Sequence, residues 1–195
     1  MTSPHSAGGA DGKLIIISGP SGAGKGTVLR RVREEGLFPL VMSVSATTRA
    51  KRPGEEDGVD YFFLTREDFL ARRGRGEFLE SFEVYPGGAL YGTLAEPVMR
   101  QLKAGKWVVL EIDVKGARQV RRSFPDAVSI FVQPPSFEVL EERLRGRGTE
   151  SEESLAKRLA QAKSELASAD EYKYRVVNDR LDDAVADLTA ILKNC

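Results

Sequence analysis

The chain has 195 residues and equal numbers of opposite charges, 29 Lys plus Arg and 29 Asp plus Glu, so its charge does not indicate nucleic acid or a membrane as a partner. Apolar runs stay below the roughly 20 residues of a membrane span, and residues 1–12 lack the apolar segment of a secretion signal. We expect a cytoplasmic protein with one main core, a small inserted subdomain and a disordered leader over 1–12. Whether it is a monomer or a homo-oligomer stays open.

A glycine-rich loop follows the first apolar run, Leu14 to Ser18, which predicts a strand. A helical pattern follows it, from Val28 to Glu35. Its glycines can take positive φ, so that successive N–H groups surround an anion, and the helix N-terminus and Lys25 add positive charge. Strand, loop and helix in this order predict a P-loop that binds the phosphates of a nucleoside triphosphate. The loop consists of Gly19, Pro20, Ser21, Gly22, Ala23, Gly24, Lys25, Gly26 and Thr27.

A polar and basic segment, residues 45–52, follows the next predicted strand, Leu40 to Ser45. Arg49 and Arg52 are three residues apart, close enough for two guanidinium groups to converge on one phosphate. Tyr61, in the predicted strand 59–64, is a candidate third donor. A solvated loop is the alternative.

A carboxylate is then predicted among apolar neighbours. Thr65 begins a helix with Asp68 three residues on, and the following strand pattern runs over 77–85. Its period of two places four residues on one face, Phe78, Glu80, Phe82 and Val84. Glu80 therefore needs a partner, which is either internal, through a salt bridge or a hydrogen bond, or a ligand. Tyr91 and Thr93 follow, two hydroxyls beside a glycine that we expect to be flexible.

The rest of the chain alternates between strand and helix patterns. The predicted segments are helix 96–103, strand 107–110, helix 114–124, strand 128–133, helix 137–145 capped by Ser136, a helix with Leu155, Leu159, Ala162 and Leu166 on one face, strand 174–178 and helix 181–192. Five core strands alternating with helices predict an α/β fold with a mostly parallel sheet.

Charged groups accompany these segments at two places. Glu111 and Asp113 follow a buried strand, where α/β folds place metal or sugar contacts; Asp113 could instead cap the next helix. An arginine-rich stretch with two glycines, 143–154, separates two helices. Its arginines, with Arg158 beside the apolar helix face, predict either a lid that closes over phosphates or a charged surface.

Taken together, nine ordered motifs resemble guanylate kinases over nearly the whole chain: GPSGAGKGT, SATTRAKRPGE, DYFF, FLESFEVY, YGT, LEIDVKGA, RLRGRGTESEES, AKRLAQAKSEL and VVND. The resemblance implies transfer of the γ-phosphoryl group of ATP to GMP, giving ADP and GDP. It also implies a P-loop kinase fold with a five-stranded, mostly parallel sheet. The expected parts are a core (13–45, 93–143 and 159–195), a GMP-binding subdomain (46–92) and a helical lid (144–158).

The resemblance also assigns roles to residues. ATP is expected on the glycine-rich loop and Asn178, the GMP phosphate on Ser45, Arg49, Arg52, Tyr61 and Tyr91, and guanine on Glu80 and Thr93 with Asp113 nearby. The expected catalytic residues are Lys25, Arg49, Arg143, Arg147 and Arg158. Glu111 stands where some members carry Asp. Since the acceptor is itself an anionic phosphate, the reaction needs no histidine base.

Magnesium is the expected cofactor, and one departure affects how it is bound. P-loops usually place Ser or Thr directly after the lysine to contact Mg²⁺, whereas this chain has Gly26 there and Thr27 one position later. Mg²⁺ readily keeps several waters. We therefore expect Mg²⁺ to arrive with ATP and to have no direct protein ligand, with Thr27 and Glu111 as the alternatives.

Two rival functions remain. Adenylate kinases share the GAGKGT form of the loop, but the Glu80 carboxylate suits the N1 and N2 donors of guanine. Some guanylate-kinase-like domains are scaffolds that bind phosphorylated peptides without catalysis. Lys25 and the lid arginines favour an enzyme over a scaffold.

Overall fold

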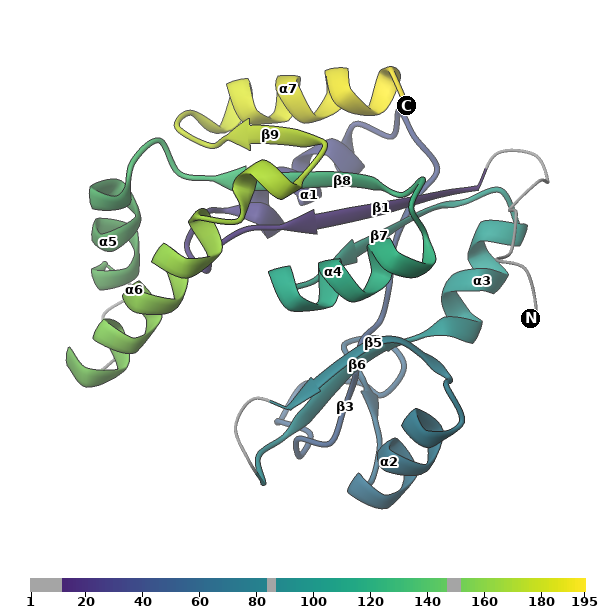
Figure 1. Cartoon of the computed structure of the whole chain (residues 1–195). Helices are drawn as coiled ribbons and strands as arrows, with labels where there is room; N and C mark the ends of the chain where they lie inside the picture. Colours follow the sequence, from purple (N-terminus) through teal and green to yellow (C-terminus); the bar gives the residue numbers. More distant parts are fainter. Residues whose placement is uncertain (1–11, 84–86, 147–151) are drawn as a thin grey trace. The chain divides into compact units, whose positions relative to one another are not determined.

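The fold is built on a five-stranded sheet of order β2-β7-β1-β8-β9, flanked by helices (Figure 1). The structure is a computed structural model that describes residues 12–83, 87–146 and 152–195. The strands are β1 (Lys13–Ser18), β2 (Leu40–Met42), β7 (Trp107–Glu111), β8 (Val128–Gln133) and β9 (Tyr174–Val177). β2 pairs with β7, β1 with β8 and β8 with β9, all in parallel. This confirms the predicted α/β class, because parallel neighbours require helical crossovers.

The chain forms two compact units, which are described separately. The second unit takes in residues 15–39, 111–114 and 128–195. Its helices are α1 (Lys25–Glu34), α5 (Phe137–Arg145), α6 (Glu152–Leu166) and α7 (Leu181–Lys193), with a 3₁₀ turn, η1 (Ala169–Glu171). α7 packs against both α1 and β9, and α5 packs against α6 (Figure 1). Leu155 and Ala162 of the predicted α6 stripe are buried there.

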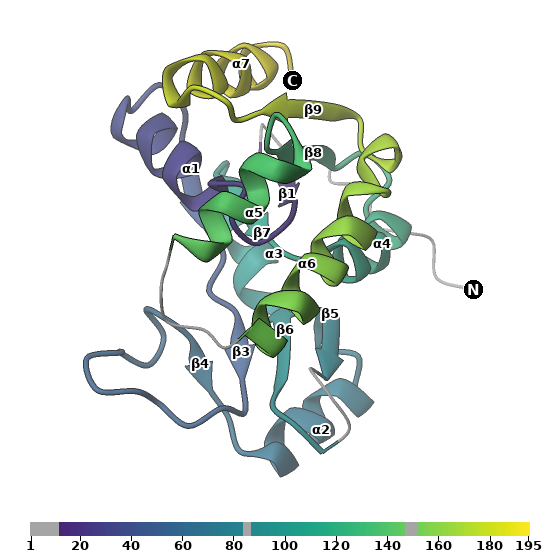
Figure 2. The same ribbon diagram turned by 90° about the vertical axis from the view of Figure 1, so that its left-hand side faces the viewer.

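The first unit, chiefly residues 40–110 and 115–127, contains a smaller sheet of order β4-β3-β6-β5 (Figure 2). Its strands are β3 (Ala46–Thr47), β4 (Phe62–Phe63), β5 (Phe78–Glu83) and β6 (Leu90–Leu94). The helices are α2 (Arg66–Gly74), α3 (Ala95–Lys103) and α4 (Val114–Ser123). As predicted, Thr65 caps α2 by accepting the Asp68 N–H. Phe69 of α2 packs against one face of this sheet, where it forms a buried cluster with Ala46, Leu90 and Leu94 of the strands.

A register shift in β5 corrects the predicted strand face. Phe78 lies opposite Leu94, but Glu80 lies opposite the preceding residue, Thr93, so Leu79 is an extra residue on β5. Phe78 consequently joins the apolar cluster under α2 and stacks on Phe69, with 4.3 Å between ring centroids. Glu80 is on the opposite face, so the prediction that it shares a face with Phe78 was wrong.

Two glycine predictions were also wrong. Gly92 lies within β6, a strand that the sequence did not indicate, and a β-carbon there would be 2.6 Å from the Glu80 carbonyl oxygen. This glycine permits close strand packing rather than flexibility. Helix α1 begins at Lys25 rather than near Val28, so Gly26 is helical, whereas Gly19, Gly22 and Gly24 have positive φ.

In the described part of the chain, no helix is long and apolar enough to cross a membrane.

Candidate functional site

The glycine-rich loop joins β1 to α1 and borders a cavity of about 340 Å³. Lys25 is the first helical residue, and its Nζ donates to the carbonyl oxygens of Gly19 (2.7 Å) and Pro20 (3.1 Å). The helix N-terminus and this ammonium group both favour an anion in the cavity. The lining residues are Ser21, Gly22, Gly24, Lys25, Gly26, Thr27, Arg30 and Glu111.

Asn178, at the end of β9, is hydrogen-bonded to this loop. Its side-chain Nδ2 donates to the Ala23 carbonyl oxygen at 2.8 Å, and its backbone N–H donates to Gln133 of β8, also at 2.8 Å. Only 7% of Asn178 is exposed. A β-carbon on Gly24 would be 2.2 Å from Nδ2, so the amide and any larger residue at 24 exclude each other. The sequence predicted Asn178 only as an adenine contact and gave no sign of this hydrogen bond to the loop.

Replacing Asn178 by alanine is therefore expected to loosen the loop. The buried Ala23 carbonyl would lose its side-chain donor, which costs about 1–3 kcal/mol of unfolding free energy. Denaturant unfolding measures this loss, and KM for ATP should rise with it. Asn194→Ala is a matched control, because Asn194 makes a similar side-chain bond to the Ala190 carbonyl in an exposed position. Equal losses of unfolding free energy for the two variants would show that the buried hydrogen bond contributes no more than the exposed one.

Two of the three predicted lid arginines lie next to this loop. Arg158 of α6 donates to the Ser21 hydroxyl at 2.6 Å, and Arg143 of α5 donates to the Asn178 carbonyl oxygen at 3.0 Å. Arg147 falls outside the described residues. Arg158 therefore contacts the loop itself, and Arg143 contacts the residue that is hydrogen-bonded to the loop.

Carboxylates complete the surroundings of the loop. Glu111 is exposed and lines the cavity, and a β-carbon on Gly26 would be 4.0 Å from its Oε2. Thr27 lines the same cavity, so a carboxylate and a hydroxyl, both suited to a hard cation, border one space. Asp113 directly precedes α4. Among the described residues, no group of three or more His, Cys, Asp or Glu could hold a metal ion.

Glu165 of α6 is a group that the sequence reasoning missed. Burial raises the pKa of its carboxyl above the ordinary value, and the Asp113 charge raises it further, whereas the Gln161 hydrogen bond and the Lys25 charge lower it. The carboxylate of Glu165 is thus within electrostatic reach of Lys25. Its sequence position, one residue before the apolar Leu166 on a helix, carries no signal of that proximity.

The first unit contains a second candidate site around Arg49. Its guanidinium lies 5.4 Å from the Tyr61 ring centroid and 5.8 Å from that of Phe63. Tyr61 in turn meets Tyr91 edge to face, with 6.1 Å between centroids. The structure thus brings together Arg49, Tyr61 and Tyr91 from three separate sequence motifs, while their role as one phosphate site stays a prediction.

Glu55 joins Arg49 and Arg52 through the side chain of Arg49 and the backbone N–H of Arg52, and the convergence of the two guanidinium groups stays a prediction. Glu55 accepts from both terminal nitrogens of Arg49 and from the backbone N–H of Arg52. The ion pair raises the pKa of Arg49, and the hydrogen bonds from Arg49 and Arg52 lower the pKa of the Glu55 carboxyl. Ser45 is half-buried just before β3, where its carbonyl accepts the Phe62 N–H.

Glu80 and Thr93 face each other across β5 and β6. The Thr93 hydroxyl donates to Glu80 Oε1 at 2.7 Å, and the two residues are 0% and 3% exposed, Thr93 being the more buried. Both interpretations left open by the sequence are compatible with this contact, since one carboxylate accepts several hydrogen bonds. On the same face, Phe82 stacks on Tyr91 with 5.8 Å between centroids. Aromatic and polar groups thus lie together on this face of the small sheet.

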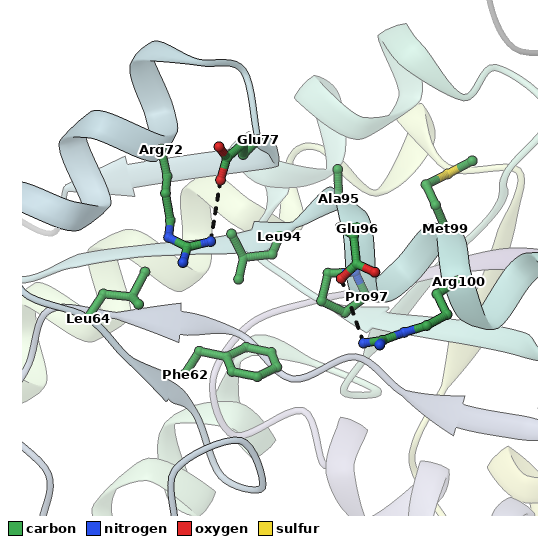
Figure 3. A pocket seen from close by; sticks show the side chains of 10 residues that line it. All are labelled: Phe62, Leu64, Arg72, Glu77, Leu94, Ala95, Glu96, Pro97, Met99 and Arg100. Atoms are coloured by element: carbon green, nitrogen blue, oxygen red, sulfur yellow. Dashed lines mark hydrogen bonds and ion pairs between the residues drawn. The ribbon is translucent and has the colours of Figure 1, made fainter.

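A larger pocket of about 660 Å³ lies elsewhere in the first unit, between α2, α3 and the small sheet (Figure 3). Its wall is mainly apolar, with Phe62 and Leu94 at its centre. Its charged groups form internal pairs, Arg72 with Glu77 (3.3 Å) and Arg100 with Glu96 (3.7 Å). Its mainly apolar wall distinguishes this pocket from the cavity at the glycine-rich loop, where Lys25 and the N-terminus of α1 favour an anion.

An open α/β sheet whose first strand leads through a lysine-bearing glycine loop into a helix defines a P-loop kinase. The family model described as guanylate kinase matches residues 11–195. The chain belongs to the guanylate kinase family.

Individual relatives agree with this family. The chain is 50% identical over 183 residues to a guanylate kinase of Trichormus variabilis, covering 94% of this chain and 90% of that protein. It is 50% identical over 181 residues to one of Carboxydothermus hydrogenoformans, covering 93% and 87%. The crystal structure of guanylate kinase from Anaplasma phagocytophilum matches with a TM-score of 0.73 and 32% identity, covering 97% of this chain and 88% of that one. A shikimate kinase from Bacteroides thetaiotaomicron shares the fold alone, with 17% identity and a TM-score of 0.52.

Proposed function

We infer that the chain is a nucleoside monophosphate kinase that transfers the γ-phosphoryl group of ATP to GMP, giving ADP and GDP. Family membership and about 50% identity to curated guanylate kinases support the activity. Within the chain, the observation that carries it is the buried Glu80 carboxylate hydrogen-bonded to Thr93, on the sheet that also presents Tyr91. This carboxylate can accept from guanine N1–H and N2–H₂ together. A cytoplasmic location is part of the same proposal.

The phosphate loop is proposed to bind ATP. Its cavity borders the N-terminus of α1, and Lys25 would move its ammonium group from the loop carbonyls to the β and γ phosphates. Arg143 and Arg158, which are now hydrogen-bonded to Asn178 and Ser21, would turn to the phosphates as the lid closes, together with Arg147. Closure would also exclude water, which otherwise hydrolyses ATP. Asn178 would contact adenine through its remaining amide oxygen.

The Arg49 cluster is proposed to bind the GMP phosphate. Arg49 would donate to it along with Arg52, Tyr61, Tyr91 and Ser45, and guanine would lie against Glu80 and Thr93. Asp113 remains a proposed contact to the base. The aromatic rings around Arg49 restrict the guanidinium and strengthen its field by limiting water access.

The chemistry follows from the charge of the acceptor. An oxygen of the GMP phosphate attacks the γ-phosphorus of ATP, a new P–O bond forms, and the bond to the β–γ bridging oxygen breaks with its electron pair leaving on ADP. Because the attacking oxygen is already anionic, no general base is required. Lys25 and the arginines would stabilise the charge on the transferred group, which is the main catalytic requirement of such a reaction.

Mg²⁺ would neutralise part of the charge on the phosphates of ATP. Thr27 and Glu111 border the cavity and fit a hydrated hard cation, so we propose that they contact it at most through its water. Gly26 offers no oxygen from a side chain.

Thr27→Val tests this assignment. The variant is expected to keep Mg²⁺-dependent activity to within about tenfold, the loss for one modest hydrogen bond. Calorimetry of the nucleotide-free protein should detect no Mg²⁺ binding tighter than roughly millimolar, since Mg²⁺ is rarely held by protein groups alone. Tight binding without nucleotide, or a variant indifferent to Mg²⁺, would make the Thr27 hydroxyl a direct ligand.

Formation of ADP and GDP from ATP and GMP tests the proposed function directly. Purified protein should produce both products in equal amounts and produce neither at a comparable rate when GMP is omitted or replaced by AMP. Binding of GMP without turnover would favour the scaffold alternative. Equal use of AMP would favour an adenylate kinase.

A further inference from the structure

Glu55 is joined to both arginines of the proposed GMP phosphate site. Its Oε1 accepts from Arg49 Nη2 at 2.7 Å, and its Oε2 accepts from Arg49 Nη1 at 3.0 Å. Oε2 also accepts the backbone N–H of Arg52 at 2.8 Å. The two side chains of the ion pair are each 18% exposed, so this is a two-pronged contact partly shielded from water. One carboxylate therefore fixes the conformation of the segment between the two arginines.

The hydrogen bonds of Arg49 to Glu55 use one edge of its guanidinium. The group has five N–H donors, of which Nη1 uses two, on Glu55 and on the Ala50 carbonyl oxygen (2.7 Å), and Nη2 uses one on Glu55. Arg49 also hydrogen-bonds the side chain of Tyr91, itself a proposed donor to the GMP phosphate. Nε and the second Nη2 hydrogen point along the other edge, which is the second fork by which arginine binds an oxyanion.

The surroundings of Arg49 hold the group in this orientation. Its backbone N–H donates to the Thr47 hydroxyl at 3.1 Å, and the rings of Tyr61 and Phe63 lie against the guanidinium. The only contact of opposite charge that the structure records for Arg49 among the described residues is Glu55. Without it, the long side chain would regain rotamer freedom that phosphate binding would again have to remove.

We propose that Glu55 is a positioning residue that holds the end of Arg49 so that its other edge receives the GMP phosphate. The proposal rests on the function inferred above and adds a residue outside the set that the sequence assigned. Glu55 does not itself contact the nucleotide. The negative charge of Glu55 repels the GMP phosphate only through water and the intervening Arg49 guanidinium. The two-pronged contact with Glu55 sets the orientation in which Arg49 donates.

Binding of GMP and of guanosine to Glu55→Gln tests the role. Glutamine has one acceptor oxygen, and its NH₂ group would face the guanidinium, so the two-pronged clamp is lost while size is kept. Calorimetry should show GMP binding weakened about tenfold or more, as expected for losing a charged hydrogen bond, and guanosine binding unchanged. Glu56→Gln is the matched control, since Glu56 is an exposed neighbour and should leave both ligands unaffected. Glu55→Asp should recover part of the GMP affinity.

Three outcomes overturn the proposal. Tighter GMP binding by Glu55→Gln would make the carboxylate a competitor that occupies the phosphate position. Equal weakening of GMP and guanosine would make Glu55 a residue of general stability. Unchanged GMP binding by Glu55→Gln would show that Arg49 is correctly placed without the Glu55 carboxylate. Failure of the proposed function appears differently, as a wild-type protein that neither binds GMP nor forms ADP from ATP and GMP.

The pH dependence provides a second readout. Hydrogen bonds from Arg49 and Arg52 hold the pKa of the Glu55 carboxyl below its ordinary value, so the clamp is charged above that lowered pKa and is lost as the pH falls through it. The ratio of wild-type to Glu55→Gln affinity for GMP should therefore stay constant from neutral pH to about pH 5, because an ordinary Glu titrates near 4.3 and this one lower. Using the ratio removes the titration of the GMP phosphate itself. A ratio that already falls between pH 7 and pH 5 would contradict the clamp.

Discussion

Replacing Lys25 by alanine is expected to lower kcat by about 10³-fold or more while the protein remains folded, because a charge contact with the transferred phosphoryl group stabilises the transition state by several kcal/mol. The variant loses the two hydrogen bonds from Lys25 Nζ to the carbonyl oxygens of Gly19 and Pro20, but the bond from Asn178 to Ala23 and the packing of α1 against α7 remain. Steady-state kinetics with ATP and GMP measures the loss, and thermal unfolding reports the fold.

A matched control separates the role of this lysine from a general effect of charge removal. Lys103 is an exposed lysine at the end of α3, and Lys103→Ala should keep wild-type activity. A folded Lys25→Ala protein that retains more than about a tenth of the wild-type rate would remove Lys25 from the transition-state contacts.

Discrimination between GMP and AMP is expected to depend on Glu80. Guanine presents donors at N1 and N2 to the carboxylate, while adenine has an acceptor at N1 and sets lone pairs against it. Sites built on such polar matching discriminate by roughly 10⁴-fold or more. Glu80→Gln should lower kcat/KM for GMP and narrow the gap to AMP, because the amide can donate to adenine N1.

The measurement is the ratio of kcat/KM for the two substrates in one preparation. Glu80 is buried, so the substitution also costs stability, but the ratio does not depend on the fraction of protein that is folded. Glu96→Gln, an exposed carboxylate on α3, should leave the ratio unchanged. A wild-type protein that uses AMP and GMP equally well would exclude both the role of Glu80 and the proposed specificity.

Most of the large sheet could be predicted from sequence, and much of the small sheet could not. Strands such as Val128–Gln133 are largely apolar runs bounded by prolines or glycines, and the predicted and observed bounds of β8 coincide. β3 has only two residues and lies within a polar segment, and β6 contains a glycine between two hydroxyl-bearing residues. Such strands are stabilised by their neighbours in the sheet rather than by their own composition.

The site residues divide in the same way. Lys25 and Arg49 stand in motifs whose spacing implies their chemistry, and the structure places Lys25 on a carbonyl oxygen of its own loop and Arg49 beside the Tyr61 ring. The hydrogen bond from Asn178 to Ala23 and the proximity of Glu165 to Lys25 join residues that are far apart in the chain. Glu55 is close to Arg49 in sequence, but an acidic residue in a polar loop usually indicates solvent exposure, so only the geometry revealed the contact.

The extra residue in β5 lets one short strand direct two side chains to opposite faces of the small sheet. Phe78 must fill the core beneath α2, and Glu80 must face the opposite side, although a regular strand would direct both to the same face. Removing Leu79 would make Phe78 and Glu80 neighbours in the chain, and a regular strand directs neighbouring residues to opposite faces, so both side chains would keep their places without the bulge. Natural variants of the protein should accordingly carry either the bulge or a strand one residue shorter, whereas a regular strand of the present length would turn Phe78 or Glu80 to the wrong face.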